Sequence, residues 1–281
     1  MGYVSHYVPA SSSAQASGEL TTVNAVLIVG YVSHLVTQRE GLPVGNALQD
    51  KTVLVVGRGG GLACAVALLA RSEGARVVGA GRDKAKLATA YDDSGISAEV
   101  VDITDDESIA ALADRLGPVD HVVSTASARA RGELPDLQRE NLRLSFDTKV
   151  IGPTMLAKYF APQMNPGGSF VLFAGVHAFK LSVGYLGVGI TNGAVDFLTR
   201  WLAVELAPIR VNCVSPGVID TGAWESLGEE RKREYFEHIS SRNPAGRIGT
   251  PDDIAGAVLF AMTNTFLTGV TLKVDGGEPL T

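Results

Sequence analysis

The chain has 281 residues, of which 46% are hydrophobic and 6% aromatic, so it is long enough for one large α/β domain with an aliphatic core. The formal net charge is −6 and no block of Lys or Arg stands out, which argues against a nucleic-acid partner. The two cysteines, Cys64 and Cys213, show neither a disulfide framework nor a metal-ligand spacing, so we expect a cytoplasmic protein without a bound metal.

Residues 1–47 are predicted to form an N-terminal extension, partly flexible, ahead of a single domain over residues 48–281. A Ser-rich stretch at 11–18 has the composition of a flexible segment. Residues 20–36 are fairly apolar, but polar side chains interrupt them and no basic flank precedes them, so neither a membrane span nor a signal peptide is expected. We expect the extension to pack on the domain or on a neighbouring subunit.

The domain is predicted to open with a strand, a glycine-rich turn, a helix and a second strand. Residues 51–56 are a continuous β-branched run typical of a buried strand. An Ala- and Leu-rich helix is expected at 64–72 and a second strand at 76–80. The turn before the helix reads Gly57-Arg58-Gly59-Gly60-Gly61-Leu62-Ala63. This order is that of a mononucleotide-binding unit, and it predicts a Rossmann-type doubly wound parallel sheet of the α/β class.

Small residues in this turn have physical tasks in holding a dinucleotide. Gly57 lets the chain leave the strand sharply, Gly61 lets the backbone approach a pyrophosphate, and Ala63 lets helix and strand pack closely. The N–H groups at the start of the helix are then free to bind phosphates, whereas a glycine turn without a ligand is the disfavoured alternative. The predicted cofactor contacts in the turn are Gly57, Arg58, Gly60, Gly61 and Leu62.

The end of the second strand selects between the two nicotinamide cofactors. An acidic residue there would favour NAD, but this chain has Gly81-Arg82. Gly81 leaves room, and the planar guanidinium of Arg82 can pair with a 2′-phosphate, with Arg58 as a second cation. The alternative for Arg82 is a solvated turn residue. We expect NADP(H) as the cofactor.

Motifs further along the chain carry a family resemblance. They are Asp102-Ile103-Thr104-Asp105, the segment 210–217 with its Pro216-Gly217 turn, Thr268-Gly269, and Val274-Asp275-Gly276-Gly277. Together with the glycine turn, they resemble the short-chain dehydrogenase/reductase superfamily over roughly residues 48 to 281. The resemblance implies further cofactor contacts. Asp102 and Ile103 are expected at the adenine, Val218 at the nicotinamide and Thr221 at the pyrophosphate. The turn Pro216-Gly217 before Val218 is expected to contact the cofactor as well.

The residues that resemble the family's catalytic wall depart from its pattern. Ser124-Thr125-Ala126-Ser127 stands where the family usually has Asn-Asn-Ala-Gly, and Lys149 stands where a helical Asn is expected. Gly175, Val188 and Asn192 occupy the positions of the expected Ser, Tyr and Lys. The segment 193–200 matches the family helix and fixes this register. The usual proton relay from Tyr is therefore predicted to be absent.

Three residues near this wall are candidates for catalysis in its place: His177, Lys149 and Asn192. His177 follows the fifth strand, expected at 169–173, at the edge where open α/β sheets bind ligands. Lys149 can stabilise developing negative charge or organise water. The alternatives are a His177 that only bonds a carbonyl and a Lys149 that faces solvent or fills the Asn position structurally.

The substrate side is predicted from the loops. Arg131, with Arg129 beside it, is a candidate for holding an anionic group, unless both are solvated loop cations. Tyr185 is expected to form a pocket wall rather than a substitute acid. The segment 223–250 is expected to form a lid in which Trp224 helps line an apolar pocket and the charge run 229–234 faces outward. By resemblance, the helices around 145–164 and 190–207 form a homodimer or homotetramer interface.

Two functions follow. The first is an NADP(H)-dependent oxidoreductase acting on a small to medium apolar carbonyl, imine or conjugated substrate with a non-standard proton path. An activated acceptor needs an acid less, because positioning of the reacting groups supplies much of the rate. The alternative is a non-redox cyclase or isomerase, or a cofactor-binding pseudoenzyme, on the same fold.

Overall fold

One seven-stranded sheet organises the domain, with strand order β3-β2-β1-β4-β5-β6-β7. Every neighbouring pair of strands is parallel. The computed structural model describes residues 46–91 and 94–281. The strands are β1 (Thr52–Val56), β2 (Arg76–Gly81), β3 (Ser97–Val100), β4 (His121–Ser124), β5 (Ser169–Phe173), β6 (Arg210–Pro216) and β7 (Thr271–Val274). This arrangement confirms the predicted Rossmann-type sheet.

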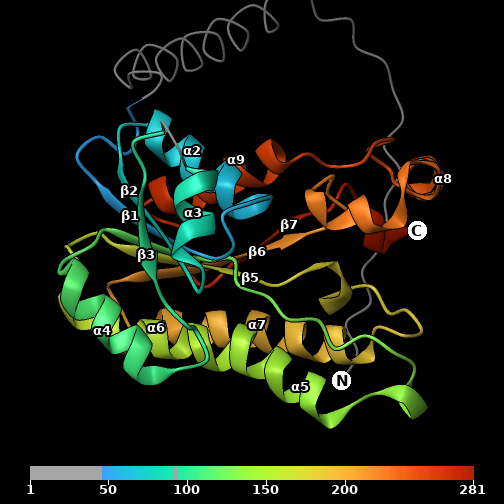
Figure 1. The fold of residues 1–281 in the computed structure, drawn as a ribbon, viewed down its shortest axis with the longest axis horizontal. Coiled ribbons are helices and arrows are strands. Elements are labelled where there is room, and N and C mark those ends of the chain that lie inside the picture. The colour runs from blue at the N-terminus through green and yellow to red at the C-terminus, as the bar shows by residue number, and fades with distance from the viewer. Residues whose placement is uncertain (1–45, 92–93) are drawn as a thin grey trace, which may run out of the picture. The chain divides into compact units, whose positions relative to one another are not determined.

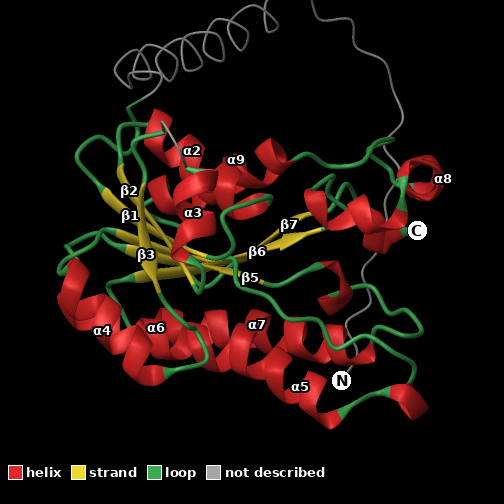
Figure 2. Cartoon of the chain, in the orientation of Figure 1, coloured by secondary structure: helices red, strands yellow, loops and turns green. Residues whose placement is uncertain are grey.

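Helices cover both faces of the sheet (Figure 1). One layer holds α2 (Leu62–Ser72), α3 (Lys84–Ala90) and α9 (Pro251–Thr263). The opposite layer holds α4 (Asp106–Leu116), α5 (Arg139–Phe146), α6 (Gly152–Phe160) and α7 (Leu186–Glu205). Helix α8 (Glu229–Arg242) lies apart from both layers, beside the end of the chain (Figure 2).

The core consists of two aliphatic clusters, one on each face of the sheet, as the composition predicted. Val53, Val55 and Val171 meet α2 and α9 in the first cluster. Leu54 and Phe170 meet the α4, α6 and α7 layer in the second. Because β1 and β5 are buried along their whole length, their sequences are continuously apolar rather than alternating.

The strand order reverses between β1 and β4, and this reversal places the candidate site. The chain leaves β1 toward β2 on one side and later returns to β4 on the other. Val56 pairs with Ser124, so the turns that follow these two strands begin side by side at the carboxyl edge of the sheet. Ligands of open α/β sheets bind at such a switch point.

Several element boundaries differ from the sequence expectation. Helix α2 begins at Leu62 rather than 64, because Gly61 already ends the turn with a positive φ of 55°. The helix expected around 145–164 is α5, then a π-helical segment at Asp147–Ile151, then α6. The helix expected at 190–207 begins one turn earlier, at Leu186.

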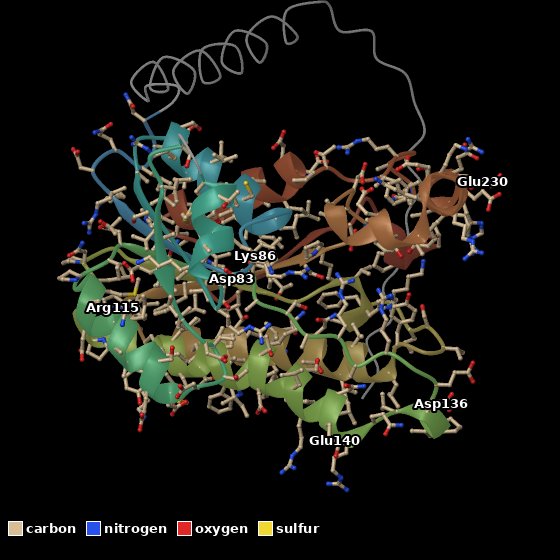
Figure 3. All side chains as sticks on the ribbon, in the orientation of Figure 1. Asp83, Lys86, Arg115, Asp136, Glu140 and Glu230 are labelled. Atoms are coloured by element: carbon tan, nitrogen blue, oxygen red, sulfur yellow. The ribbon has the colours of Figure 1, made fainter. Side chains whose placement is uncertain are left out.

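Charged side chains surround the outside of the domain, with Arg115, Glu140 and Glu230 among those labelled in Figure 3. Within the described ranges, no group of His, Cys, Asp and Glu side chains is arranged to hold a metal ion. No helix in those ranges is long and apolar enough to cross a membrane. Residues Gly45–Thr281 form one compact unit. The predicted extension lies almost wholly outside the described residues.

Candidate functional site

The glycine turn after β1 is held tightly against its neighbours. The Gly57 N–H donates to the Ala80 carbonyl at 2.8 Å, and the Thr125 backbone N–H and hydroxyl both donate to the Val56 carbonyl, at 2.8 and 3.1 Å. A Cβ on Gly57 would collide with the Thr125 hydroxyl. A Cβ on Gly81 would lie 2.5 Å from the Gly57 carbonyl oxygen. Close neighbours therefore favour glycine at position 57 in the turn and at position 81 at the end of β2, and for Gly57 this steric reason differs from the predicted one.

The start of α2 is open toward the predicted phosphate position. No side chain caps this helix, so the first N–H groups, from Leu62 onward, keep their capacity to bind an anion. A Cβ on Gly60 would meet no atom within 4 Å. Gly61 lies beside Thr221: a Cβ on Gly61 would be 3.5 Å from the Cβ of Thr221. The structure thus brings together two residues predicted separately as pyrophosphate contacts.

Arg82 and Asp102 lie near one another at the ends of β2 and β3. The Thr104 N–H and hydroxyl donate to the Asp102 carboxylate at 3.0 and 2.7 Å. The bond from the Thr104 N–H lowers the pKa of Asp102 most, and the charge of Arg82 adds to this. Neither Arg82 nor Arg58 forms an ion pair in the described part of the chain, so both guanidinium groups are free for a phosphate. The Ile103 side chain is buried in the core, which leaves its backbone for the adenine.

The turn after β6 is fixed by a close backbone approach. The Gly217 N–H donates to the Val274 carbonyl at 3.1 Å, and a Cβ on Gly217 would lie 2.7 Å from the Cα of Asp275. The Val218 carbonyl accepts the Gly249 N–H at 3.1 Å. These contacts hold Val218 at the carboxyl edge of the sheet, where the nicotinamide contact is predicted.

Lys149 and Asn192 bond to each other inside the catalytic wall. The buried Lys149 ammonium donates to Asn192 Oδ1 at 2.5 Å and to the Ala174 carbonyl at 3.0 Å. Burial lowers the pKa of Lys149 to about 8. Lys149 does not face solvent, which removes that alternative. The positions where the resemblance implies Asn and Lys thus carry Lys and Asn in exchanged order, in direct contact.

Gly175 is coupled to this pair. A Cβ at Gly175 would lie 2.9 Å from Asn192 Nδ2, inside normal contact distance. Because Lys149 fixes the amide of Asn192, a larger side chain at position 175 would have to displace a bonded group. Val188, at the expected Tyr position, is half-buried. Lys149, Gly175 and Asn192 therefore form one interlocked set.

Lys149 lies in the middle of the π-helical segment Asp147–Ile151. Wider turns of this kind shift the side chains that follow and are frequent at functional sites. A Cβ on Gly152 would lie 2.5 Å from the Ile103 carbonyl, so this helix passes very close to the loop after β3. The segment presents the Lys149 ammonium to the end of β5 at Ala174.

Tyr185 lies against two of the predicted site residues. Its ring stacks on the His177 ring at 3.9 Å between centroids, and the Arg131 guanidinium lies 5.3 Å from its centroid. His177 Nδ1 lies 3.1 Å from the Lys180 carbonyl, which it can reach as a donor. Burial lowers the pKa of His177, so the ring is mainly neutral near pH 7. His177, Arg131 and Tyr185 thus form one cluster.

The segment predicted to form a lid, called the lid from here on, contains α8 and the turn before it. Trp224 donates its indole N–H to the Ile219 carbonyl at 2.7 Å and packs on Tyr235 of α8, 5.0 Å between centroids. The predicted charge run begins this helix and is largely exposed, although Lys232 is half-buried and paired with Asp220 and Glu225.

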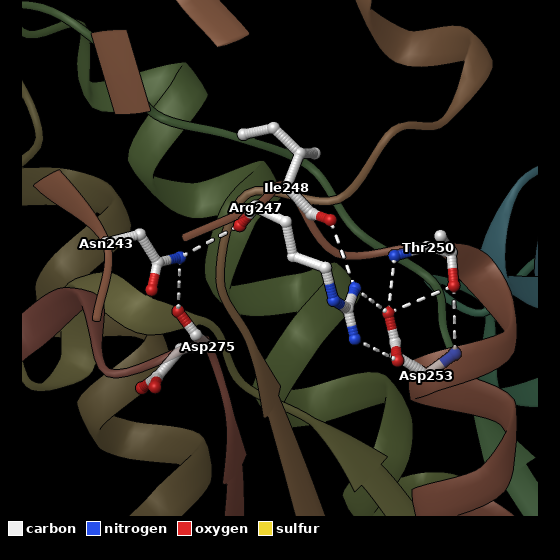
Figure 4. Close-up of polar contacts among 6 residues, drawn as sticks. All are labelled: Asn243, Arg247, Ile248, Thr250, Asp253 and Asp275. Atoms are coloured by element: carbon white, nitrogen blue, oxygen red, sulfur yellow. Dashed lines mark hydrogen bonds and ion pairs between the residues drawn. The ribbon is translucent and has the colours of Figure 1, made fainter. Parts of the chain in front are cut away.

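The base of the lid is anchored by a polar network (Figure 4). Arg247 forms a two-pronged ion pair with Asp253, at 2.6 and 2.8 Å. Thr250 and Asp253 form a capping box at the start of α9. Asn243, at the end of α8, donates to the Asp275 carbonyl at 3.3 Å. The lid is therefore tied to the turn after β7.

Sequence reasoning missed Lys180 and Glu278. These two residues form an ion pair at 3.5 Å, with Glu278 buried and its Oε2 without a hydrogen bond in the described structure. Glu278 lies close enough to His177 and Tyr235 to raise the pKa of both, although burial acts more strongly on each. No pattern in the sequence links positions that are 98 residues apart.

Comparisons with known proteins show which family the chain resembles. The profile of the family described as enoyl-(acyl carrier protein) reductase matches residues 57–278. Dehydrogenase/reductase SDR family member 4 of Pongo abelii is 32% identical over 257 residues, which cover 85% of this chain and 91% of that protein.

Two solved structures share the fold over most of the chain. A small-chain dehydrogenase in complex with NADPH is 29% identical, with a TM-score of 0.72, and the match covers 83% of this chain and 100% of that one. The MalC reductase/Diels-Alderase from Malbranchea aurantiaca is 27% identical, with a TM-score of 0.78, over 84% of this chain and 99% of that one. The family match and these relatives show that the chain belongs to the short-chain dehydrogenase/reductase superfamily of oxidoreductases.

Proposed function

We propose that the protein is an NADP(H)-dependent oxidoreductase that reduces a small to medium apolar carbonyl, imine or conjugated substrate by a non-standard proton path. The observation that carries this proposal is the open glycine turn at the carboxyl edge of β1, with two unpaired guanidinium groups beside it. The NADPH complex of a structural relative supports the choice of cofactor.

The residues present fit this cofactor. Gly60 and Gly61 leave open the space in front of the uncapped start of α2, where a pyrophosphate can accept N–H bonds. Arg82 and Arg58 are available for the 2′-phosphate. When bound, the nicotinamide supplies or accepts a hydride. The protein's own part is to hold it near Val218 and to orient the substrate.

Lys149 is the residue that we propose to take over the electrostatic task of the missing relay. Its ammonium has three N–H donors, and the two named acceptors use two of them. It forms no ion pair in the described ranges, so its charge is available to stabilise negative charge that develops on the substrate. Its lowered pKa, about 8, also suits proton donation near neutral pH. In this proposal Asn192 holds Lys149 in place, and His177 supports the pocket wall.

A non-redox cyclase or isomerase is the second candidate. The observations that favour it are Gly175 and Val188, which offer no acid beside the reacting position, and the likeness to a reductase that is also a Diels-Alderase. Such a protein uses the shape of its pocket to align a conjugated substrate, with proximity as the source of rate.

We further propose a homodimer or homotetramer, in a cytoplasmic setting. Helix α7 exposes Phe197, Trp201 and Val204, with 55%, 56% and 76% of each residue accessible. Apolar side chains this exposed along one helix are typical of a subunit interface.

Transfer of deuterium separates the two candidate functions. Purified protein is incubated with NADPH deuterated at C4 and a panel of conjugated aldehydes, ketones and cyclic imines, and the products are analysed by mass spectrometry. We expect one deuterium in the product and stoichiometric loss of NADPH. A product formed at the same rate without NADPH, and without deuterium, would instead establish the cyclase or isomerase.

A further inference from the structure

The loop after β4 contacts its neighbours closely at every second residue from 128 to 132. The Ala128 carbonyl accepts the Ser145 hydroxyl at 3.0 Å, and the Gly132 N–H donates to the Gly184 carbonyl at 3.0 Å. Between them Ala130 is fully buried, and a Cβ on Gly187 would lie 2.6 Å from its carbonyl oxygen. The loop is therefore held at three alternate positions, once by α5 and twice at the start of α7.

The two residues between these anchors are arginines, and both are exposed. Arg129 and Arg131 form neither an ion pair nor a side-chain hydrogen bond in the part of the chain that the structure describes. Desolvation, followed by the like charges of Arg131 and Arg58, lowers the pKa of Arg129. Like charges gathered in this loop repel one another, and an anion bound between them would relieve that repulsion.

Aromatic rings adjoin the two arginines. Arg131 lies over the Tyr185 ring, which in turn stacks on His177. Tyr235 of the lid is near enough for both arginines to act on its pKa, against the larger effect of burial, which raises it. Glu278, the acid that acts on both Tyr235 and His177, is already paired with Lys180. Within the described residues, the cluster thus combines aromatic rings with two cations that have no ion-pair partner.

We propose that the substrate carries a carboxylate, which Arg129 and Arg131 bind together while the rest of the molecule lies against Tyr185 and the lid. The planar guanidinium forks match the two oxygens of a carboxylate, and a loop pinned at alternate residues presents them without much loss of backbone freedom. This inference rests on the proposed function and narrows its substrate to an apolar or conjugated acid.

Binding of small acids tests this directly. Isothermal titration measures the Kd of benzoate and trans-cinnamate, and of the uncharged benzamide and cinnamamide, with the full-length protein alone and saturated with NADP⁺. We expect the acids to bind at least about tenfold more tightly than the amides. R129A and R131A should each weaken the acids about tenfold to hundredfold and leave the amides unchanged. R131K keeps the charge but loses the planar guanidinium group, so its affinity for the acids should lie between those of the wild type and R131A.

R143A is the matched control, because Arg143 is an exposed arginine on α5 outside the pocket, and it should leave every Kd unchanged. Equal affinity of acids and amides for the wild type overturns the proposal, as does failure of both acids to bind. An equal loss of NADP⁺ and acid binding in R129A and R131A overturns it as well, since these arginines would then serve the cofactor. Failure of the wild type to bind NADP⁺ contradicts the proposed function instead. The titrations of the protein alone still show in that case whether the two arginines bind a carboxylate.

Discussion

Thr125 explains why the first residue of the glycine turn must be glycine. Gly57 is absent from the residues with positive φ, so alanine is allowed there by its backbone. The obstacle is the Thr125 hydroxyl, which stands where a Cβ would lie and is itself bonded to the Val56 carbonyl. Steric exclusion between two turns, rather than conformational freedom, fixes this position.

G57A should therefore destabilise the fold by about 1–3 kcal/mol, the usual cost of overpacking, and weaken NADPH binding. In G57A/T125A the colliding hydroxyl is gone and the nearest remaining atoms are the Cβ of Ala63 at 3.2 Å and the Cβ of position 125 at 3.5 Å, so most of the loss should be recovered. Thermal unfolding and an NADPH titration measure both effects. If the double variant were as damaged as G57A, another contact would be responsible.

The buried ammonium of Lys149 predicts that kcat/KM falls at alkaline pH. Above a pH of about 8 the ammonium loses its proton, because burial has lowered its pKa from the ordinary value near 10.4. If its charge stabilises the reacting substrate, kcat/KM should fall about tenfold per pH unit above that point. The neighbours that act on this group are Cys213, whose pKa burial raises to about 11, and Arg129.

K149M should lower kcat/KM about 100-fold or more at pH 7 and abolish the alkaline limb. N192L, which removes the acceptor but not the cation, should shift the limb rather than abolish it. If kcat/KM of K149M still fell at alkaline pH as in the wild type, another group would be the one that titrates, and Lys149 would have a structural role.

At the scale of elements, the lid depends on the capping of α9. The Asp253 carboxylate accepts from Arg247 and from both donors of Thr250, so it joins the segment after α8 to the next helix. The hydrogen bond from Arg247 is the main reason why the pKa of Asp253 lies well below its usual range. Stability from this carboxylate is thus present above its unfolded pKa of about 3.9 and is lost as the pH falls below that value.

D253N should cost about 1 kcal/mol at pH 7, seen as a Tm lower by about 2–4 °C, since it loses a helix cap and an ion pair. The difference from the wild type should shrink as the pH falls from 5 to 3. D252N, at the preceding residue of the same turn, serves as the control because the Asp252 side chain has no hydrogen bond or ion pair within the described ranges. An undiminished difference at pH 3 would show that charge is not the cause.

The sequence predicted the sheet, the glycine turn and most helices because these depend on local patterns: apolar runs, glycines between a strand and a helix, and familiar turn motifs. It did not predict the π-helical segment, which single-residue propensities do not distinguish from an α-helix. Nor did it predict that Lys149 would reach Asn192, 43 residues away, or that Glu278 would approach His177. Such contacts come from tertiary packing between elements that have no local pattern in common.

For the whole molecule, remote parts of the chain contribute to the candidate site at the carboxyl edge of the sheet. The glycine turn, Thr125, Ala174 and Thr221 come together because parallel strands all end at one edge of the sheet. The predicted cofactor side of this site keeps the resemblance to the family, whereas the predicted substrate side carries an exchanged Lys–Asn pair and two arginines without an ion-pair partner among the described residues. We propose above all that this edge of the sheet binds NADP(H).

Titration of the full-length protein with NADPH and NADH tests that claim most directly, with R82D as the variant and R143D as the charge-matched control. We expect NADPH to bind at least about tenfold more tightly than NADH, because Arg82 gains a charge-assisted bond only from the 2′-phosphate. R82D should weaken NADPH about tenfold to hundredfold and leave NADH within about threefold, while R143D changes neither. Tighter binding of NADH by the wild type, or an equal loss of both cofactors in R82D, would contradict the account.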